Sequence, residues 1–230
     1  VVGVSGGIDS SVVSTLCAQT GIKTLVASMP ISQRPEHHDL SIKHAQWLAN
    51  KFQNAYYVEI DLTYPFLTFE NSLKDKKFTS DLGLANSKAR LRMMTLYQIA
   101  ASTTGLVVGT GNKVEDFGVG FYTKYGDGGV DISPIADCNK SQVWAIGKEL
   151  GILEEIQMAE PTDGLWSDGR TDTDQLGMSY KEIEHLMSRP DEPGYEKYLA
   201  IRKKNLHKMK PIPVCKFDGK DTLDTDQKET

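Results

Sequence analysis

The chain has 230 residues, of which 39% are hydrophobic and 25% charged, so it can bury the core of a full domain. A net charge of −5 argues against broad electrostatic binding of nucleic acid, and no apolar run reaches membrane-spanning length. The three cysteines, Cys17, Cys138 and Cys215, lie far apart and form no Cys-x-x-Cys pair, which excludes a zinc ribbon and a disulfide framework. We therefore expect a cytoplasmic protein with no nucleic-acid and no membrane partner.

The first segment joins an apolar run to a glycine turn and a helix start. Val1–Ser5 predicts a strand, Gly6 and Gly7 a turn, and Ser10–Gln19 a helix. Two adjacent glycines let the backbone approach an anion closely, and the free N–H groups of the following helix then face that anion. The segment predicts a phosphate-binding loop, in which Asp9 is placed to hold magnesium beside the phosphates.

Short β-type runs alternate with helical patterns along the first half. Further strands are expected at Thr24–Met29, Ala55–Ile60 and Leu106–Gly109, with helices at Asp39–Phe52 and Asn86–Thr103. This alternation predicts an α/β fold, a doubly wound parallel sheet with helices on both faces. Ligands bind such sheets beyond the carboxyl ends of the strands, where the loops after the first and fourth strands both lie.

The second half is rich in loops. Three further helices are expected, at Lys140–Leu150, Ser179–Met187 and Gly194–Lys210. We expect one domain over residues 1–217, followed by a polar, disordered tail at 218–230. Because the first residue is not a methionine, a preceding segment is expected. The adjacent His37 and His38 lack metal-ligand spacing and are interpreted as loop residues.

Two glycine-containing segments follow the fourth expected strand. Gly109–Glu115 reads Gly-Thr-Gly-Asn-Lys-Val-Glu and offers a second contact to phosphate and magnesium. Tyr122–Asp131 is dense in glycine and charge, and it lies between two apolar segments. It is compatible with a binding loop and equally with a solvated hairpin that turns at Gly-Asp-Gly-Gly.

These segments together resemble the NAD synthetase family, a branch of the PP-loop ATP pyrophosphatases with an adenine nucleotide alpha hydrolase-like fold. The hallmarks appear in order, as Ser-Gly-Gly-Ile-Asp-Ser-Ser at Ser5–Ser11, Asn-x-x-Ala-Arg-x-Arg-Met at Asn86–Met93, Gly-Thr-x-Asn-Lys-x-Glu at Gly109–Glu115 and Thr-Lys-Tyr-Gly-Asp-Gly-Gly at Thr123–Gly129. The resemblance extends over residues 1–210. The last of these motifs, following Gly-Thr-Gly-Asn-Lys, is far more specific than the first.

The resemblance implies a ligase that forms a C–N bond. In this family ATP adenylates the carboxylate of deamido-NAD and releases pyrophosphate, and ammonia then displaces AMP to give NAD. Because the substrate carboxylate is the nucleophile, the protein supplies positioning and charge neutralisation, and no Ser-His-Asp set is needed. The implied partners are ATP, deamido-NAD, ammonia and a second copy of the chain in a homodimer. Glutamine-dependent relatives carry a further hydrolase domain, for which this length leaves no room unless the chain is a fragment.

The resemblance also implies roles for individual residues. The residues implied to bind ATP are Ser5, Gly6, Gly7, Asp9, Ser10, Ser11, Gln33, Arg90, Thr110, Lys140 and Thr162. Those implied to bind deamido-NAD are Lys124, Asp127, Asp131, His207 and Lys208. Mg²⁺ would be held by Asp9 and Glu115, with the neighbouring Asp116 as the alternative to Glu115. Asp9, Asp127 and Lys140 would be catalytic.

Several positions depart from the family pattern or admit a plainer interpretation. Ser28 stands where the family often has an arginine directed at ATP, and Thr173 and Gln175 replace two expected carboxylates. Arg90 is also compatible with a surface charge, and Lys208 with a solvated helix face. Residues at helical spacing that favour core or dimer packing over ligand contact are Met93, Leu96 and Tyr97.

Two other functions remain open from the sequence. One is a different PP-loop enzyme, such as a tRNA-thiolating ligase or a GMP synthetase module. The scattered cysteines and the acidic balance argue against the thiolating enzyme. The other is a regulatory module that holds ATP without turnover, which would not need Asp9, Glu115, Asp127 and Lys140 together.

Overall fold

The computed structural model describes residues 1–33, 35–166 and 168–215, so the tail expected at 218–230 lies outside the described residues. Its sheet consists of β1 (Val2–Gly3), β2 (Thr24–Ser28) and β3 (Ala55–Glu59) in the order β1-β2-β3. Both pairings are parallel, and Val26 lies opposite Val2 on one side and Tyr57 on the other. The parallel sheet expected from the alternating pattern is confirmed.

The fourth expected strand is much shorter than predicted. Within Leu106–Gly109, Val108 alone forms β-bridges, in parallel to Val2 and Ile132. The backbone N–H of Val107 donates to the carboxylate of Asp131 at 2.8 Å and is therefore lost to the ladder. A side chain thus replaces a neighbouring strand as hydrogen-bond partner, which hydrophobic patterning does not reveal.

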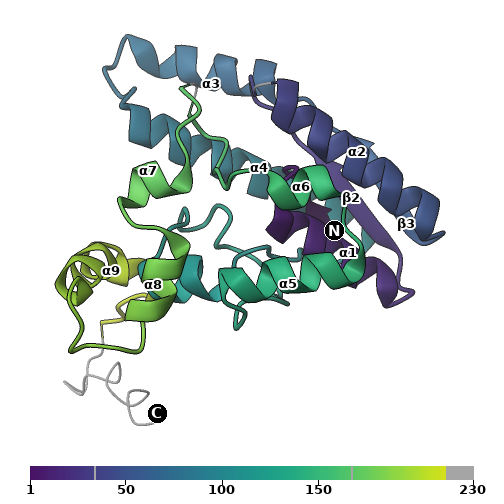
Figure 1. Cartoon of the computed structure of the whole chain (residues 1–230). Helices are drawn as coiled ribbons and strands as arrows, with labels where there is room; N and C mark the ends of the chain where they lie inside the picture. The colour runs from purple at the N-terminus through teal and green to yellow at the C-terminus, as the bar shows by residue number, and fades with distance from the viewer. Residues whose placement is uncertain (34, 167, 216–230) are drawn as a thin grey trace.

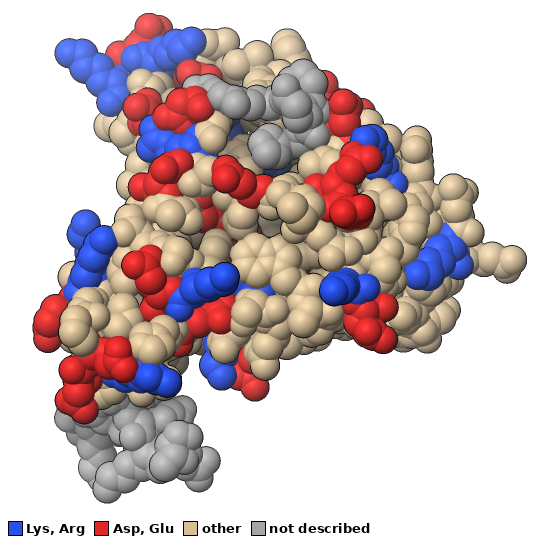
Figure 2. Space-filling view, viewed as in Figure 1, with Lys and Arg blue, Asp and Glu red and all other residues tan. Residues whose placement is uncertain are grey.

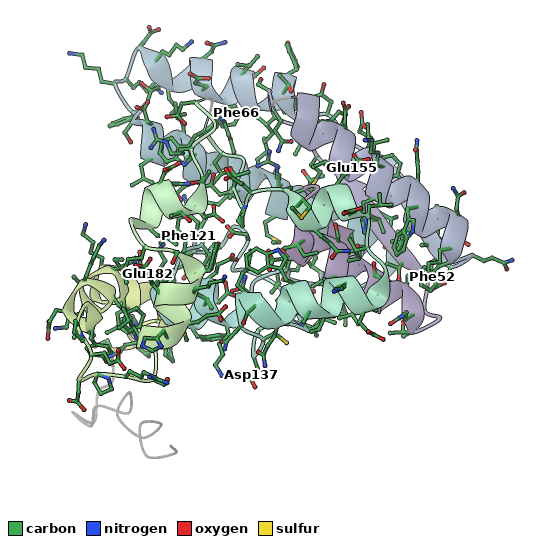
Figure 3. All side chains as sticks on the ribbon, viewed as in Figure 1. Phe52, Phe66, Phe121, Asp137, Glu155 and Glu182 are labelled. Atoms are coloured by element: carbon green, nitrogen blue, oxygen red, sulfur yellow. The ribbon has the colours of Figure 1, made fainter. Side chains whose placement is uncertain are left out.

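Helices cover both faces of the sheet (Figure 1). One face carries α1 (Ile8–Gln19), α2 (Pro35–Lys51), α5 (Lys140–Leu150) and α6 (Glu154–Met158), and the other carries α3 (Thr63–Lys74) and α4 (Asp81–Thr103). Successive residues of β2 face opposite ways, so Val26 packs in the first core and Ala27 in the second. Phe66, labelled on α3 in Figure 3, belongs to the second core. The doubly wound architecture is confirmed.

Two helical segments differ from expectation. The helix α3 was not predicted, because its first turn contains Pro65 and its sequence is rich in aromatic residues. The Asp61 carboxylate accepts a hydrogen bond from the Thr63 N–H at 2.8 Å and so stabilises the first turn of this helix. The interpretation of His37 and His38 as loop residues is wrong, because both lie in α2. That helix begins at Pro35, where proline is tolerated because the first-turn N–H has no partner in any case.

A third cluster of buried side chains closes the molecule at one end. It joins the π-helical turn η1 (Val114–Val119) to α7 (Asp172–Leu176), α8 (Tyr180–Leu186) and α9 (Tyr195–Met209). Phe121 packs against this cluster and is labelled beside α7 and α8 in Figure 3. None of the helices within the described ranges combines the length and the apolar character needed to cross a membrane.

Candidate active site

A cavity of about 410 Å³ opens where the carboxyl ends of β1 and β2 meet the loops from the second half of the chain. Its volume lies in the range of small-molecule sites. The loop after β1, the loop after Val108 and the segment 159–166 all contribute to its wall. The sequence-predicted residues that line it are Ser5, Gly6, Gly7, Asp9, Ser10, Gln33, Thr110, Glu115, Asp116, Asp127, Lys140, Thr162 and Lys208.

The glycine loop between β1 and α1 is organised by its own hydroxyl groups. Gly6 has φ 86°, a left-handed conformation that glycine adopts without strain. The Gly7 N–H donates to Ser5 Oγ at 3.3 Å, and Ser10 Oγ donates to the Gly7 carbonyl at 3.1 Å. These bonds hold the loop against the start of α1, whose first-turn N–H groups and positive dipole end favour an anion. The loop is therefore suited to binding phosphate.

A buried ammonium group lies at the centre of the site. Lys140 is 2% exposed, and its Nζ donates to Asp9 Oδ2 at 2.5 Å and to Glu115 Oε1 at 2.9 Å. Burial alone would lower the pKa of Lys140, but the two carboxylates outweigh it and raise that pKa. The Asn112 side-chain amide donates to Asp9 Oδ1 at 3.0 Å, and the hydroxyl of Tyr180 lies 2.6 Å from Glu115 Oε1.

Neighbouring carboxyl groups have raised pKa values. Burial, with repulsion from Glu115, Asp127 and Asp9, raises the pKa of Asp116 to about 7. Asp127 is open to the cavity but deep in the molecule, and desolvation raises its pKa to about 6. By contrast Lys140 and Tyr180 outweigh burial at Glu115 and hold its pKa below the usual range. The site therefore combines ionised and readily protonated carboxyl groups near neutral pH.

The segment Tyr122–Asp131 is not a solvated hairpin, because it is built of turns and helps to wall the cavity, and its role as a binding loop stays a prediction. The Thr123 N–H donates to Asp127 Oδ1 at 3.0 Å, which fixes the carboxylate, and Lys208 Nζ donates to the Tyr122 carbonyl at 2.7 Å. A Cβ on Gly128 would lie 2.3 Å from the ring of Tyr122, so the turn requires glycine there. Lys208 thus anchors the loop from α9 and is not a solvated charge.

Part of the cavity wall is a network of polar side chains. Trp166 Nε1 donates to Gln175 Oε1 at 2.9 Å, and Gln175 Nε2 donates to Asp163 Oδ2 at 3.0 Å. Gln175 therefore takes part in the wall although it replaces an expected carboxylate. Thr173 is exposed and does not line the cavity.

Several residues with implied ligand roles lie outside the cavity lining. Ser11 is fully buried and donates to the Gly7 carbonyl at 2.9 Å, so it supports the loop from beneath. Asp131 holds the hydroxyl of Tyr97 and the N–H of Val107. Arg90, Lys124 and His207 form a chain of contacts beside the cavity. In that chain Arg90 Nε donates to the Lys124 carbonyl at 3.2 Å, and Lys124 Nζ donates to the His207 carbonyl at 3.1 Å.

Other cavity residues were not identified from the sequence as functional. They include Asn86, Arg92, Asp163, Trp166, Asp172 and Gln175. Asn86 and Arg92 belong to the motif at Asn86–Met93. The motif therefore pointed to them as well, although Arg90 was the residue of this motif that was assigned a ligand role. Asn112 belongs to the motif at Gly109–Glu115, but the roles of Asn112 and Tyr180 in holding the two carboxylates are recognised only from tertiary contacts.

The chemistry of the centre fits magnesium. Asp9 and Glu115 converge on one cation, and carboxylate oxygens with substrate phosphates form a typical Mg²⁺ ligand set. In the described part of the chain no group of three or more His, Cys, Asp or Glu side chains forms a metal site by itself. Magnesium binding therefore requires phosphate oxygens as further ligands and movement of the Lys140 ammonium, which lies between the two carboxylates.

The chain is similar in sequence to a known protein family. Residues 1–217 match the family model described as NAD synthase. The NH(3)-dependent NAD(+) synthetase of Carboxydothermus hydrogenoformans is 41% identical over 190 residues, which are 81% of this chain and 75% of the relative.

Two solved structures are also similar. The NMN synthetase from Francisella tularensis matches with a TM-score of 0.86 and 32% identity, covering 94% of this chain and 88% of that chain. The NH3-dependent NAD synthetase from Campylobacter jejuni matches with a TM-score of 0.71 and 26% identity, over the same shares of the two chains.

Proposed function

Because the chain belongs to the NAD synthase family, we propose that it amidates deamido-NAD to NAD with ammonia at the expense of ATP. A carboxylate oxygen of the substrate attacks the α-phosphorus of ATP, forming an acyl adenylate and releasing pyrophosphate. Ammonia then attacks the acyl carbon, so the amide forms and AMP leaves. The single observation that carries this proposal is the buried Asp9–Lys140–Glu115 centre beside a glycine loop suited to phosphate.

In this proposal, one region of the cavity binds the phosphates of ATP and another binds ammonium. The loop from Ser5 to Ser10 binds the departing pyrophosphate through backbone N–H groups, which needs no rearrangement as charge develops. Lys140 is close enough to move from the two carboxylates to a phosphate oxygen. Asp127, with a pKa of about 6, holds ammonium and accepts the proton that it loses before attack.

We propose that magnesium is held by Asp9 and Glu115. When bound, the ion supplies charge neutralisation on the phosphate oxygens. Asp116 is the alternative to Glu115. Geometry favours Glu115, because its carboxylate shares the Lys140 ammonium with Asp9, at 2.9 Å and 2.5 Å.

A second candidate is the amidation of nicotinate mononucleotide. It is supported by the similarity to the Francisella tularensis NMN synthetase, whose TM-score of 0.86 exceeds that of the Campylobacter jejuni NAD synthetase, 0.71. Both reactions form the same bond on the same pyridine carboxylate. They differ in the size of the substrate, because deamido-NAD carries an adenosine half that needs a binding surface and nicotinate mononucleotide does not.

One experiment tests both candidates. The purified protein is supplied with ATP, magnesium, ammonium and either acid, and the nucleotide products are separated. Equal amounts of AMP, pyrophosphate and amide support the proposal, and the acid with the higher kcat/KM identifies the substrate. Formation of ADP contradicts the proposal. AMP and pyrophosphate formed without dependence on either acid contradict it and favour another PP-loop enzyme, and binding of ATP with no product contradicts it and favours a binding module.

We further propose a homodimer formed through α3 and α4. Large apolar side chains are exposed along this pair of helices and its connecting loop, and Met94 (64% exposed) is among them; the others are Leu67, Phe69, Phe78 and Leu82. Such a patch favours a protein interface. In light scattering, Met94→Glu should shift the wild-type dimer toward monomer, whereas a monomeric wild type contradicts the proposal.

The proposed compartment is the cytoplasm. The described cysteines, Cys17, Cys138 and Cys215, are all free thiols, and Cys215 is exposed. Free thiols persist where glutathione and thioredoxin keep the environment reducing. On the face drawn in Figure 2, acidic and basic side chains are interspersed, so no extended field of one sign favours a polyanionic partner there.

A further inference from the structure

Arg92 lies in the cavity wall with part of its guanidinium unused. It is carried by α4, and its Nε donates to the carbonyl of Met29 at the end of β2, at 3.0 Å. Its Nη2 is sealed from water and has no hydrogen-bond partner among the described residues. Buried donors are rarely left unsatisfied, because each loses the water it would otherwise bind.

Nearby acids attract Arg92 without pairing with it. Asp127 and Asp163 interact with it electrostatically, but neither comes within 4.0 Å to form an ion pair in the described ranges. Asp163 already accepts hydrogen bonds from Trp166 and Gln175. Burial lowers the pKa of Arg92 to about 10, which leaves it charged at neutral pH. The wall therefore holds a cation that no neighbouring carboxylate neutralises directly.

Another arginine in the same region shows what a structural role looks like. Arg202 of α9 donates through Nη1 to the carbonyls of Phe117 and Gly118, so its contacts fasten η1 to the helix. Arg92 makes a single bond of this kind. A buried charge without such partners is expensive, and a protein retains it where a ligand supplies the counter-charge.

We propose that Arg92 is a substrate-binding residue that takes an anionic oxygen, either of the ATP α-phosphate or of the pyridine carboxylate. The proposal rests on the amidation function above and assigns one more binding residue to it. Because α4 and α1 cover opposite faces of the sheet, Arg92 approaches the cavity from the side away from the phosphate loop. Nη2, which has no hydrogen-bond partner among the described residues, is the donor proposed for the anion, and the planar fork of the guanidinium suits both phosphate and carboxylate.

The test compares Arg92→Met and Arg92→Lys with the wild type. Arg189→Met is the matched control, because Arg189 is exposed and pairs with Glu192 on the surface. Calorimetry measures binding of α,β-methylene-ATP, deamido-NAD and nicotinate mononucleotide, each without ammonium. Arg92→Met should weaken binding of the phosphate probe or of the acids by about tenfold to a hundredfold. The ligand whose affinity falls identifies the oxygen that Arg92 takes.

Stability separates binding from a structural role. Arg92→Met removes an unpaired buried charge together with one hydrogen bond to the Met29 carbonyl, so its melting temperature should fall less than that of Arg202→Met, which removes two bonds that fasten η1. If Arg92→Met does not fold, Arg92→Lys keeps the charge and should bind the affected ligand with intermediate affinity. Unchanged affinity for all three probes overturns the proposal, as does a lower kcat with all affinities unchanged.

The binding assays need no turnover. A wild type that forms no amide but binds the methylene-ATP in an Arg92-dependent way refutes the proposed function and leaves this inference standing. A wild type that forms the amide, with affinities that do not depend on Arg92, refutes the inference alone.

Discussion

Replacing Lys140 by methionine tests the buried centre most severely. The substitution keeps an unbranched side chain one atom shorter than lysine but leaves Asp9 and Glu115 facing each other without a counter-charge. Removing one partner of a buried ion pair costs about 3–5 kcal/mol, so we expect Lys140→Met to lose this much unfolding free energy near pH 8. Urea unfolding followed by tryptophan fluorescence measures the loss.

The loss should depend on pH with a definite sign. In the wild type, Lys140 holds the pKa of Glu115 below its unfolded value, so that stability is present above the unfolded pKa and fades as the pH falls through the folded one. In the variant, burial and mutual repulsion raise the pKa of Glu115 above its unfolded value and raise further the pKa of Asp9, which burial already raises in the wild type. Protonation of these carboxyl groups then removes their repulsion, so the loss of unfolding free energy in Lys140→Met should be smaller at pH 5 than at pH 8.

Two further variants sharpen this prediction. Lys140→Met combined with Glu115→Gln removes the repulsion and should recover part of the lost free energy at pH 8. Lys113→Met is the surface control, because Lys113 pairs only with the exposed Asp137. A Lys140→Met protein as stable as the wild type, or a deficit equal at both pH values, refutes the account of the centre.

Three other changes have defined outcomes. Asp9→Ala should abolish amide formation while circular dichroism remains native, since Glu115 still pairs with Lys140; unimpaired turnover would refute the metal assignment. Gly111→Ala should lower kcat/KM at least tenfold, because its Cβ would lie 2.1 Å from Asp116 Oδ2. Gly105→Ala is the control and should leave kcat/KM unchanged, because its Cβ would meet no atom closer than 3.4 Å. Asp116→Asn should raise the melting temperature more at pH 8 than at pH 5. The pKa of Asp116 is raised to about 7 in the folded protein, so keeping this carboxyl group folded and ionised costs more free energy as the pH rises from its unfolded pKa through 7. The opposite trend in thermal melts contradicts that pKa.

The sequence predicted the parts of the fold that depend on local pattern. The helix Lys140–Leu150 has the predicted bounds, and Gly151 ends it in a left-handed conformation with φ 71°. Met93 and Leu96 are buried at helical spacing in the second core, as expected, but both also line the cavity, and Tyr97 is exposed. The shortening of the fourth strand could not be predicted, because it depends on a hydrogen bond between Val107 and Asp131, which are distant in sequence.

The site was predictable to the extent that motifs carry it. The motifs located the loop at Ser5–Ser10 and the residues Asp9, Glu115 and Lys140, which the structure brings into contact. They could not show that Lys140 pairs with both carboxylates, because Lys140 lies at the start of α5, whereas Asp9 comes from α1 and Glu115 from η1. Nor does a motif distinguish Arg90, which is exposed, from Arg92, which lines the cavity.

The fate of one oxygen atom tests the proposed reaction most directly. If the carboxylate of the pyridine substrate is labelled with ¹⁸O, attack on the α-phosphorus followed by ammonia must transfer one labelled oxygen to AMP. Mass spectrometry of AMP from a single turnover should therefore find one ¹⁸O per amide formed. Amide formation with unlabelled AMP, or with the label in pyrophosphate, would contradict an acyl adenylate and the account of the site built on it.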